Sequence, residues 1–534
     1  MNEGESVPPA VAEIEAAESL HASMPSRDTG RLGHNVSRLA SGTGISILGR
    51  VVGRVGYTVS QVLLARALGP ADFGLYAIGW TLLSIAAVVA PIGLDQAVVR
   101  FGAHYHGEDK QKLKGALVHC IGYSLLSGLV LAIVCWWTAP WVALRVFHKT
   151  QLAGLLRGFS LAIPLWSGAA VAAAATRITQ RMQFTIVIED VFRQGSAALM
   201  IVVLFFVGGG LRAAVGIVVA SFGVSLLVGW FLVWRLFRSD LSSDVNAGSV
   251  HWEILGFSPA AWLAGAFAML MIWIDRLVLG HFRPASEVGL YQAASQTTML
   301  FEMILGSLSM TIAPMIVELH RRHAQHQVEE LYRISTKWAL YLTAPLFLLL
   351  AFAARDFVVV VFGAGYAAGW LPLTILLCGQ LANVGTGAVG LLLLMTGRER
   401  GWLLLTLGGF SANLVLAIVL IPPFGIVGAA VSTAISTVAF FSLAVVQVFR
   451  QLDIFPYDRR FLKILAAAAV SACLLFVAHT MVQTTPLIWI AVVAVIGSGS
   501  FLTTLLMLGL DSEDWEFLQL LRMQLRTRLG FQLI

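Results

Sequence analysis

The chain carries little charge for its length. Only 12% of its 534 residues are Asp, Glu, Lys or Arg, about half the share found in soluble domains. By contrast, 58% are hydrophobic, and the mean hydropathy is +0.82. Apolar runs of about twenty residues recur along the whole length, and each is long enough to cross a hydrocarbon core of about 30 Å as a helix. This composition excludes a soluble globular domain and predicts an all-α polytopic membrane protein.

Several chemical motifs are missing as well. The four cysteines lie in apolar runs without paired spacing, so we expect neither a disulfide framework nor a zinc site. None of the six lysines follows a glycine, so the phosphate-binding loop of ATP-driven pumps is absent. The chain has no Asp-x-Asp, and its predicted outer loops are short, which argues against a membrane glycosyltransferase, polymerase or ligase. We therefore expect a protein that is not an enzyme and holds no cofactor or metal.

Hydropathy predicts about fourteen transmembrane helices. They are expected at residues 41–66, 73–94, 115–139, 155–175, 186–208, 211–234, 259–280, 288–314, 338–354, 370–395, 402–421, 425–449, 462–481 and 487–509. Fourteen spans make the loops alternate between the two sides, and 24 of the 35 basic residues then share a side with the N-terminus, against 7 on the other side. Positively charged loops face the cytoplasm. Both termini are therefore predicted to be cytoplasmic, and the basic loops indicate membrane orientation rather than nucleic-acid binding.

This reading divides the chain into six parts. The first twenty residues contain no Lys or Arg, so they do not form a secretory signal. The last part has Leu and Trp residues at helical spacing, which predicts an amphipathic helix that lies either on the membrane or on the protein's own loops. The parts are a disordered cytoplasmic tail at 1–40, an N-lobe of six spans at 41–236, a cytoplasmic linker at 237–258, a C-lobe of six spans at 259–449, two further spans at 450–510 and a cytoplasmic amphipathic tail at 511–534.

A short motif occurs twice. Residues 70–76 read Pro-Ala-Asp-Phe-Gly-Leu-Tyr, and residues 284–291 read Pro-Ala-Ser-Glu-Val-Gly-Leu-Tyr, with one residue added. Both copies open a helix that returns to the cytoplasm, and about six spans separate them. An even number of spans gives both halves the same orientation, related by a pseudo-twofold axis along the membrane normal. Two six-helix lobes around a central cavity are typical of transporters.

These segments resemble a known family. Residues 65–76 and 93–101 are similar to the first outer turn of polysaccharide transporters and its continuation, residues 275–280 with 288–291 to the equivalent turn of the second lobe, and residues 422–430 to the turn between spans eleven and twelve. The resemblance covers about residues 41–450. The family is that of the Wzx-type lipid-linked oligosaccharide flippases, in the multidrug/oligosaccharidyl-lipid/polysaccharide flippase superfamily.

The resemblance implies a function that composition does not show. It implies a flippase in the bacterial inner membrane that translocates undecaprenyl-diphosphate-linked oligosaccharides for O-antigen, capsule or exopolysaccharide synthesis. The partners would be the lipid-linked oligosaccharide, membrane lipids, and a polysaccharide polymerase with other assembly proteins. The alternative is a multidrug or cation antiporter of the same superfamily, for which twelve spans and a mostly acidic cavity would be more typical.

Cations inside the membrane are candidates for binding the diphosphate. An arginine at a helix centre costs about 2.5–3.5 kcal/mol on insertion scales, so it needs a reason to be there. Arg50 and Arg54 lie four residues apart on one face of the first span, Arg193 lies in the fifth span and Arg276 in the seventh. Snorkelling toward the cytoplasm is the alternative for Arg50, and an ion pair within the helix is the alternative for Arg193.

Four carboxylates are candidates for gating or for coupling to H⁺ or Na⁺. They are Asp95, Glu189, Asp275 and Glu302. Neighbouring residues do not face each other on a helix, so we expect no simple mutual pair between Asp275 and Arg276. Placement at the membrane interface is the alternative for these two. A hydrogen-bonded structural carboxyl is the alternative for Glu302.

Overall fold

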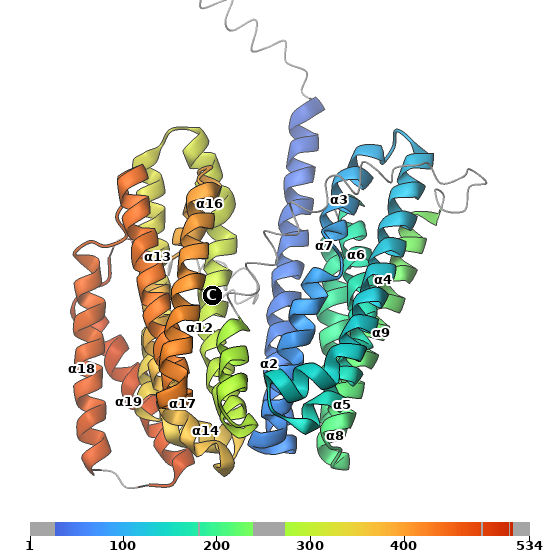
Figure 1. Cartoon of the computed structure of the whole chain (residues 1–534). Helices are drawn as coiled ribbons and strands as arrows, with labels where there is room; N and C mark the ends of the chain where they lie inside the picture. Colours follow the sequence, from blue (N-terminus) through green and yellow to red (C-terminus); the bar gives the residue numbers. More distant parts are fainter. Residues whose placement is uncertain (1–26, 180–181, 239–272, 482–483, 512, 516–534) are drawn as a thin grey trace, which may run out of the picture.

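The structure, a computed structural model, describes residues 27–179, 182–238, 273–481, 484–511 and 513–515. These residues are nearly all helical, and none of them is in a strand. They form two helical lobes that stand side by side (Figure 1). The fold class expected from the hydropathy pattern is confirmed.

The N-lobe contains the first six spans. Its helices are α2 (Arg27–Val89), α3 (Leu94–Tyr105), α4 (Lys110–Trp141), α5 (Thr150–Ser160), α6 (Ala162–Thr176), α7 (Met182–Ile186), α8 (Gly195–Val207) and α9 (Leu211–Leu236). Two π-helical segments, η1 (Val142–Val146) and η3 (Val187–Gln194), and the 3₁₀ turn η2 (Arg177–Thr179) connect some of them. Within α2, Gly69 has φ +72° and separates the first span from the second.

The C-lobe and the two additional spans follow in the chain. After a helical stretch at 273–282 come α12 (Ala285–Arg321), α13 (Gln325–Phe352), α14 (Ala354–Phe362), the 3₁₀ turn η4 (Ala364–Gly369), α15 (Trp370–Gly385), α16 (Val389–Met395), α17 (Glu399–Leu452), α18 (Arg460–Met481) and α19 (Pro486–Met507). Gly425, with φ +58°, divides α17 as Gly69 divides α2. Eleven stretches of the described residues are long and apolar enough to cross a membrane, and two of them contain these bends, so each of the two comprises two spans. The predicted seventh span is described only from residue 273 onward.

Some boundaries differ from those predicted. Helix α2 begins at Arg27 rather than near residue 41, because the sequence from 27 to 40 contains no proline to end a helix. The predicted second span stops at Val89, where Gly93 adopts φ +75° before α3 starts. The predicted tenth span is interrupted after Gly385, because Gly387 adopts φ +65° and leaves no room for a Cβ beside Thr336. The predicted linker at 237–258 lies outside the described residues from 239 onward.

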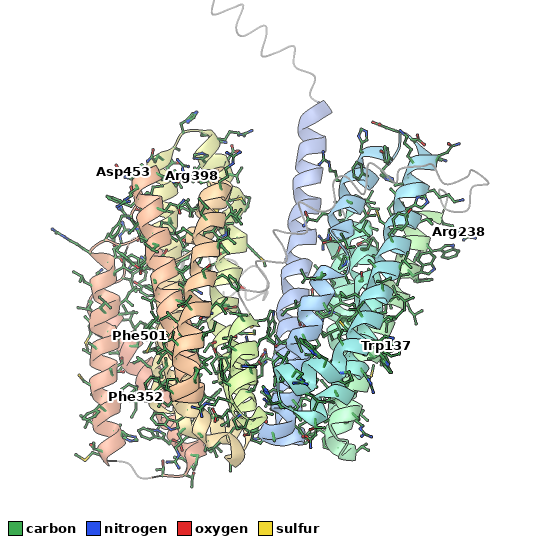
Figure 2. The ribbon with its side chains drawn as sticks, in the orientation of Figure 1. Trp137, Arg238, Phe352, Arg398, Asp453 and Phe501 are labelled. Atoms are coloured by element: carbon green, nitrogen blue, oxygen red, sulfur yellow. The ribbon has the colours of Figure 1, made fainter. Side chains whose placement is uncertain are left out.

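The outer surfaces of the lobes are apolar. Trp137 and Phe206 are 78% and 81% exposed, which is the surface that lipid tails cover in a membrane protein. In Figure 2, Trp137 lies on the outer side of the N-lobe, whereas Arg398 and Asp453 lie at one end of the C-lobe. Charge at the helix ends and apolar side chains between them are the pattern of a membrane-spanning bundle.

The start of the C-terminal tail packs on the protein itself. Lys337 of α13 is only 1% exposed, and its ammonium group lies 2.9–3.4 Å from carboxylates of Asp511, Glu513 and Asp514. Lys463 of α18 also binds Asp511, at 2.7 Å. These ion pairs hold the two additional helices to α13. Of the two alternatives for the tail, its first residues therefore contact the protein, and residues 516–534 lie outside the described part.

Among the described residues, the two lobes come together at one end of the bundle. We call the end of the bundle where α2 begins the N-terminal face, and the opposite end the far face. In Figure 1 the lobes lie together at the far face, near α14 and α5, and are further apart toward the N-terminal face. The largest hydrophobic core cluster crosses this junction, because it joins Leu64, Phe73 and Tyr76 of the N-lobe to Leu290 and Tyr366 of the C-lobe.

Candidate functional site

A polar chamber lies within the C-lobe. Its volume is about 260 Å³, and helices α12, α15 and α17 and the helical stretch at 273–282 contribute its walls. The polar residues that line it are Asp275, Arg276, Ser295, Thr298, Glu302, Gln380, Asn383, Asn413, Thr433, Ser436 and Thr437. So many hydrogen-bonding groups inside a membrane-spanning bundle are costly, and they mark a candidate substrate or ion site.

Arg276 is the central cation of this chamber. Its side chain is 2% exposed, and its guanidinium group donates to Gln292 Oε1 at 2.6 Å and to Ser295 Oγ at 2.5 Å. Nη1 lies 3.3 Å from Asp275 Oδ1. The guanidinium group also lies 4.6 Å from the centre of the Trp273 ring, a cation–π contact. The desolvation cost of burying this charge is therefore offset by hydrogen bonds and by a neighbouring carboxylate.

Asp275 is held independently of Arg276. The hydroxyl groups of Tyr291 and Thr433 lie 2.5 Å and 3.4 Å from Asp275 Oδ2. The sequence-based prediction that Asp275 and Arg276 make no mutual pair is wrong, because the flexible arginine side chain bends back to the carboxylate that precedes it. Both residues are enclosed by the protein, since they are only 5% and 2% exposed, and the alternative of an interfacial location stays a prediction.

Sequence reasoning did not find the residues that hold this pair. Tyr291, Gln292 and Ser295 lie within one turn and a half of α12, at spacings that bring them to the same side of a helix. The signal was a group of polar side chains in an apolar span, which begins at the last residue of the second copy of the repeated motif.

Glu302 of α12 lines the same chamber as Arg276. It is exposed, and it accepts a hydrogen bond of 3.2 Å from Gln380, whose own oxygen accepts one from Asn383. Two buried chamber atoms, Asn413 Oδ1 and Ser436 Oγ, have no hydrogen-bond partner among the described residues. Buried polar atoms are normally paired, so such atoms point to a polar ligand or to water.

The N-lobe has its own group of charges on η3. This π-helical segment carries Glu189, Asp190 and Arg193, and π-helical turns occur frequently at functional sites. The guanidinium carbon of Arg193 lies 5.6 Å from the centre of the Phe222 ring, and the charges of Glu189 and Asp190 act favourably on it. Glu189 also lies 4.0 Å from Arg177. The ion-pair alternative for Arg193 thus has electrostatic support, and its role in substrate binding stays a prediction.

Helix α2 passes directly beside η3. A Cβ placed on Gly53 would lie 3.0 Å from Asp190 Cβ. Arg50 and Arg54 belong to this part of α2, and their side chains lie outside the described residues. Asp95 lies elsewhere, in the first turn of α3, where a carboxylate interacts favourably with the helix dipole. The predicted residues therefore form one group in each lobe, and Asp95 belongs to neither.

The far face is closed by a contact between the two repeat motifs. A Cβ on Gly74 would lie 1.7 Å from the carbonyl oxygen of Ala285, and a Cβ on Gly289 would lie 2.0 Å from that of Pro70. The two glycines occupy the same place in the two copies. Only glycine permits so close an approach of the two backbones.

Side chains from both lobes add hydrogen bonds around this crossing. Arg66 donates to the carbonyl oxygens of Val360 and Val361 at the end of α14. Tyr366 donates to Ala65 in the opposite direction, at 2.8 Å. Each bond joins a side chain of one lobe to the backbone of the other, so lobe separation exposes the carbonyl groups without leaving a carboxylate unpaired.

Known proteins resemble this chain in sequence or in fold. The chain is 25% identical over 382 residues to the probable low-salt glycan biosynthesis flippase Agl15 of Haloferax volcanii, covering 70% of this chain and 75% of that protein. The lipid II flippase MurJ in an inward closed conformation has a TM-score of 0.66 at 15% identity, covering 86% and 97% of the two chains. An inward-facing multidrug resistance transporter of the MATE family has a TM-score of 0.63 at 15% identity, covering 75% and 94%.

The two structural matches show the fold alone, and they include both kinds of transporter that the sequence suggested. The sequence match is more specific. The profile of a family described as polysaccharide biosynthesis protein matches residues 39–320, more than half of the chain. The resemblance seen in the sequence motifs is confirmed, and the chain belongs to the polysaccharide biosynthesis protein family.

Proposed function

We propose that this protein translocates an oligosaccharide unit linked to a polyprenyl diphosphate, by alternating access between its two lobes. The observation that carries the proposal is the fully buried Arg276 at the wall of a polar chamber inside a membrane-spanning lobe. The carrier would be undecaprenyl diphosphate and the membrane a bacterial inner membrane, with both termini in the cytoplasm. A flippase relative and membership of the family support this proposal.

Arg276 suits a diphosphate because of how it is held. A guanidinium group has five N–H donors in a planar fork that matches phosphate oxygens. Asp275 is also bound by Tyr291 and Thr433, so it keeps hydrogen bonds when Arg276 turns toward a substrate. Asn413 and Ser436, whose buried oxygen atoms lack partners among the described residues, would bind sugar hydroxyl groups. One chamber thus offers a site for the charged and the neutral polar parts of the substrate.

In this proposal, the closed far face makes this conformation a loading state. The lobes are joined at the far face, so the substrate would enter from the N-terminal face, which the distribution of basic residues predicts to be cytoplasmic. Opening of the Gly74–Gly289 crossing would then release it on the other side. The coupling ion would be H⁺ or Na⁺, with Asp275 and Glu302 as its candidate ligands in the chamber.

The test is polymer export from cells that lack the native gene and carry variants of this protein. Arg276→Gln removes the charge, and Arg276→Lys keeps the charge without the fork. Arg212→Gln is the control, because Arg212 is an exposed arginine at the start of α9. We expect export to fall with both Arg276 variants at wild-type protein levels in the membrane, and to persist with the control. Unchanged export with Arg276→Gln would refute the assignment, and loss of drug or cation efflux with intact export would favour the antiporter.

A further inference from the structure

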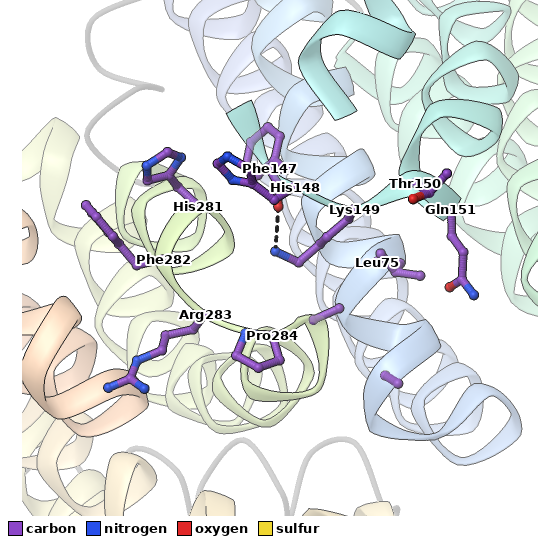
Figure 3. A pocket seen from close by; sticks show the side chains of 12 residues that line it. Leu75, Phe147, His148, Lys149, Thr150, Gln151, His281, Phe282, Arg283 and Pro284 are labelled. Carbon is purple, nitrogen blue, oxygen red and sulfur yellow. Dashed lines mark hydrogen bonds between the residues drawn. The ribbon is translucent and has the colours of Figure 1, made fainter. Parts of the chain in front are cut away.

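A second cavity lies at the far face, between the lobes and apart from the polar chamber. Its volume is about 620 Å³. The N-lobe contributes Phe147, His148 and Lys149, which follow η1, and the C-lobe contributes His281 and Phe282 (Figure 3). The ring centres of His148 and His281 lie 5.7 Å apart, and the ring planes are tilted by 57°. Because both lobes line it, this cavity exists only while the far face is closed.

The cavity is basic. None of its lining residues is Asp or Glu. Two cationic side chains, Lys149 and Arg283, belong to its lining. Arg283 points away toward α17 in Figure 3 and donates to the carbonyl oxygen of Pro422 at 2.9 Å. It also lies 3.9 Å from Glu287. Lys149 therefore supplies the positive charge that faces the cavity.

Lys149 is half-buried and bound only by backbone oxygens in the hydrogen bonds that the structure shows. Its ammonium group donates to the carbonyl oxygens of Phe147, at 3.0 Å, and Gly280 of the opposite lobe. An ammonium group has three N–H donors, so one remains for another acceptor. Burial lowers the pKa of this ammonium group. An anion in the cavity would oppose that effect, because a nearby negative charge favours the protonated form.

The two histidines add polar groups in a strained setting. His148 has φ +54°, a left-handed conformation that is unusual for residues other than glycine. Such strain is concentrated at functional sites. His281 Nδ1 contacts the carbonyl oxygen of Val146 in the other lobe. A carbonyl oxygen can only accept, so Nδ1 carries the hydrogen, and this bond joins the two lobes beside the cavity.

We propose that this far-face cavity binds a phosphate-class anion through Lys149 and the imidazole of His148, and that binding stabilises the closed far face. A ligand that binds one of two conformations shifts the equilibrium toward it. The link to lobe closure rests on the proposed alternating access, whereas anion binding does not. The anion would be either a soluble phosphate or the head group of an anionic lipid at the far face.

The probe is inorganic pyrophosphate, and its affinity is measured with the full-length protein in phosphatidylcholine nanodiscs. We expect Lys149→Gln to weaken binding at least tenfold, because a charge-assisted hydrogen bond is lost. His148→Asn tests the imidazole without adding strain, since asparagine also adopts the left-handed conformation, and it should weaken binding as well. Arg145→Gln is the matched control: Arg145 is exposed on η1, four residues before Lys149 and outside the cavity lining.

Two further measurements complete the test. Nanodiscs with phosphatidylglycerol show the source of the anion: competition with pyrophosphate identifies a lipid head group, and unchanged affinity identifies a soluble anion. Gly289→Ala keeps every lining side chain but forces the lobes apart, so it should also weaken binding. Absence of pyrophosphate binding to the wild-type protein, or equal affinity in Lys149→Gln, would overturn the proposal. Polymer export by Arg276 variants is a separate readout, so failure of this proposal is distinguishable from failure of the proposed function.

Discussion

Replacing Gly289 with alanine should open the far face. The added Cβ would lie 2.0 Å from the carbonyl oxygen of Pro70, whereas ordinary contact begins at 3.4 Å. The nearest atoms that the new Cβ would meet belong to the backbone of Pro70 and Gly74, so no side-chain rotation can relieve the clash. The two helices must therefore separate by about 1.4 Å at this crossing.

The size of the effect follows from the cost of such a separation. A gap of 0.5–1 Å already forfeits about a quarter to a half of the dispersion energy between packed atoms. Overpacking a close contact costs about 1–3 kcal/mol. If the open state is unaffected, the ratio of closed to open molecules falls by about 5- to 150-fold. The open state is unaffected because this contact is absent once the lobes part.

The assay is the distance between spin labels on the two lobes at the far face. Suitable positions are Leu144 and Arg355, which are both exposed. Gly306→Ala is the control on the same helix, since a Cβ on Gly306 meets nothing within 4 Å. We expect a longer distance with Gly289→Ala and the wild-type distribution with Gly306→Ala. The same distribution in all three proteins would refute the reasoning.

Three further predictions concern single contacts. Tyr366→Phe removes the hydrogen bond of 2.8 Å to Ala65 and should favour the open far face by about 1 kcal/mol, a roughly fivefold change in the same label distances; an unchanged ratio would contradict it. Arg276→Lys keeps the charge but loses the paired donors to Gln292 and Ser295, so export should fall by about 10- to 100-fold, measured per molecule of inserted protein; full export would show that charge alone suffices. Burial opposes ionisation of Asp511, but Lys463 and Lys337 outweigh it and lower its pKa. The ionised Asp511 carboxylate therefore stabilises the folded protein at pH values above the unfolded-state pKa of about 3.9. This stabilisation is lost as the pH falls through the lower folded-state pKa. Asp511→Asn should accordingly lower the melting temperature at pH 7, and the difference from wild type should narrow below about pH 4.

The sequence was informative about features that have a period or a motif. Hydropathy identified the spans, and the repeated motif identified two lobes of like orientation. It also singled out Arg276, because an arginine in an apolar run has no other easy explanation. What it missed is how Arg276 is held, since contacts such as that with Ser295 depend on how the helical stretch at 273–282 packs against α12.

Contacts to backbone atoms were beyond prediction for a different reason. Arg66, Lys149 and Tyr366 all donate to carbonyl oxygens of the opposite lobe. Every residue has a carbonyl group, so the acceptor leaves no mark in the sequence. The donor side chain is visible in the sequence, but an arginine or lysine near a helix end is equally expected as an orientation signal. Arg66 and Lys149 are two of the seven basic residues counted on the less basic side of the membrane, and the sequence suggested no further role for them.

The repeated motif acquires a physical meaning from the glycine crossing. In an isologous contact, each partner uses the same surface, so that residue i meets j and j meets i. Gly74 meets Ala285, the second residue of the other copy, while Gly289 meets Pro70, the first residue of its counterpart. The pseudo-twofold axis therefore passes close to this contact. Alanine at Gly74 should act as alanine at Gly289 does, and the double variant should cost less than the sum of the two, because one separation of the helices relieves both clashes.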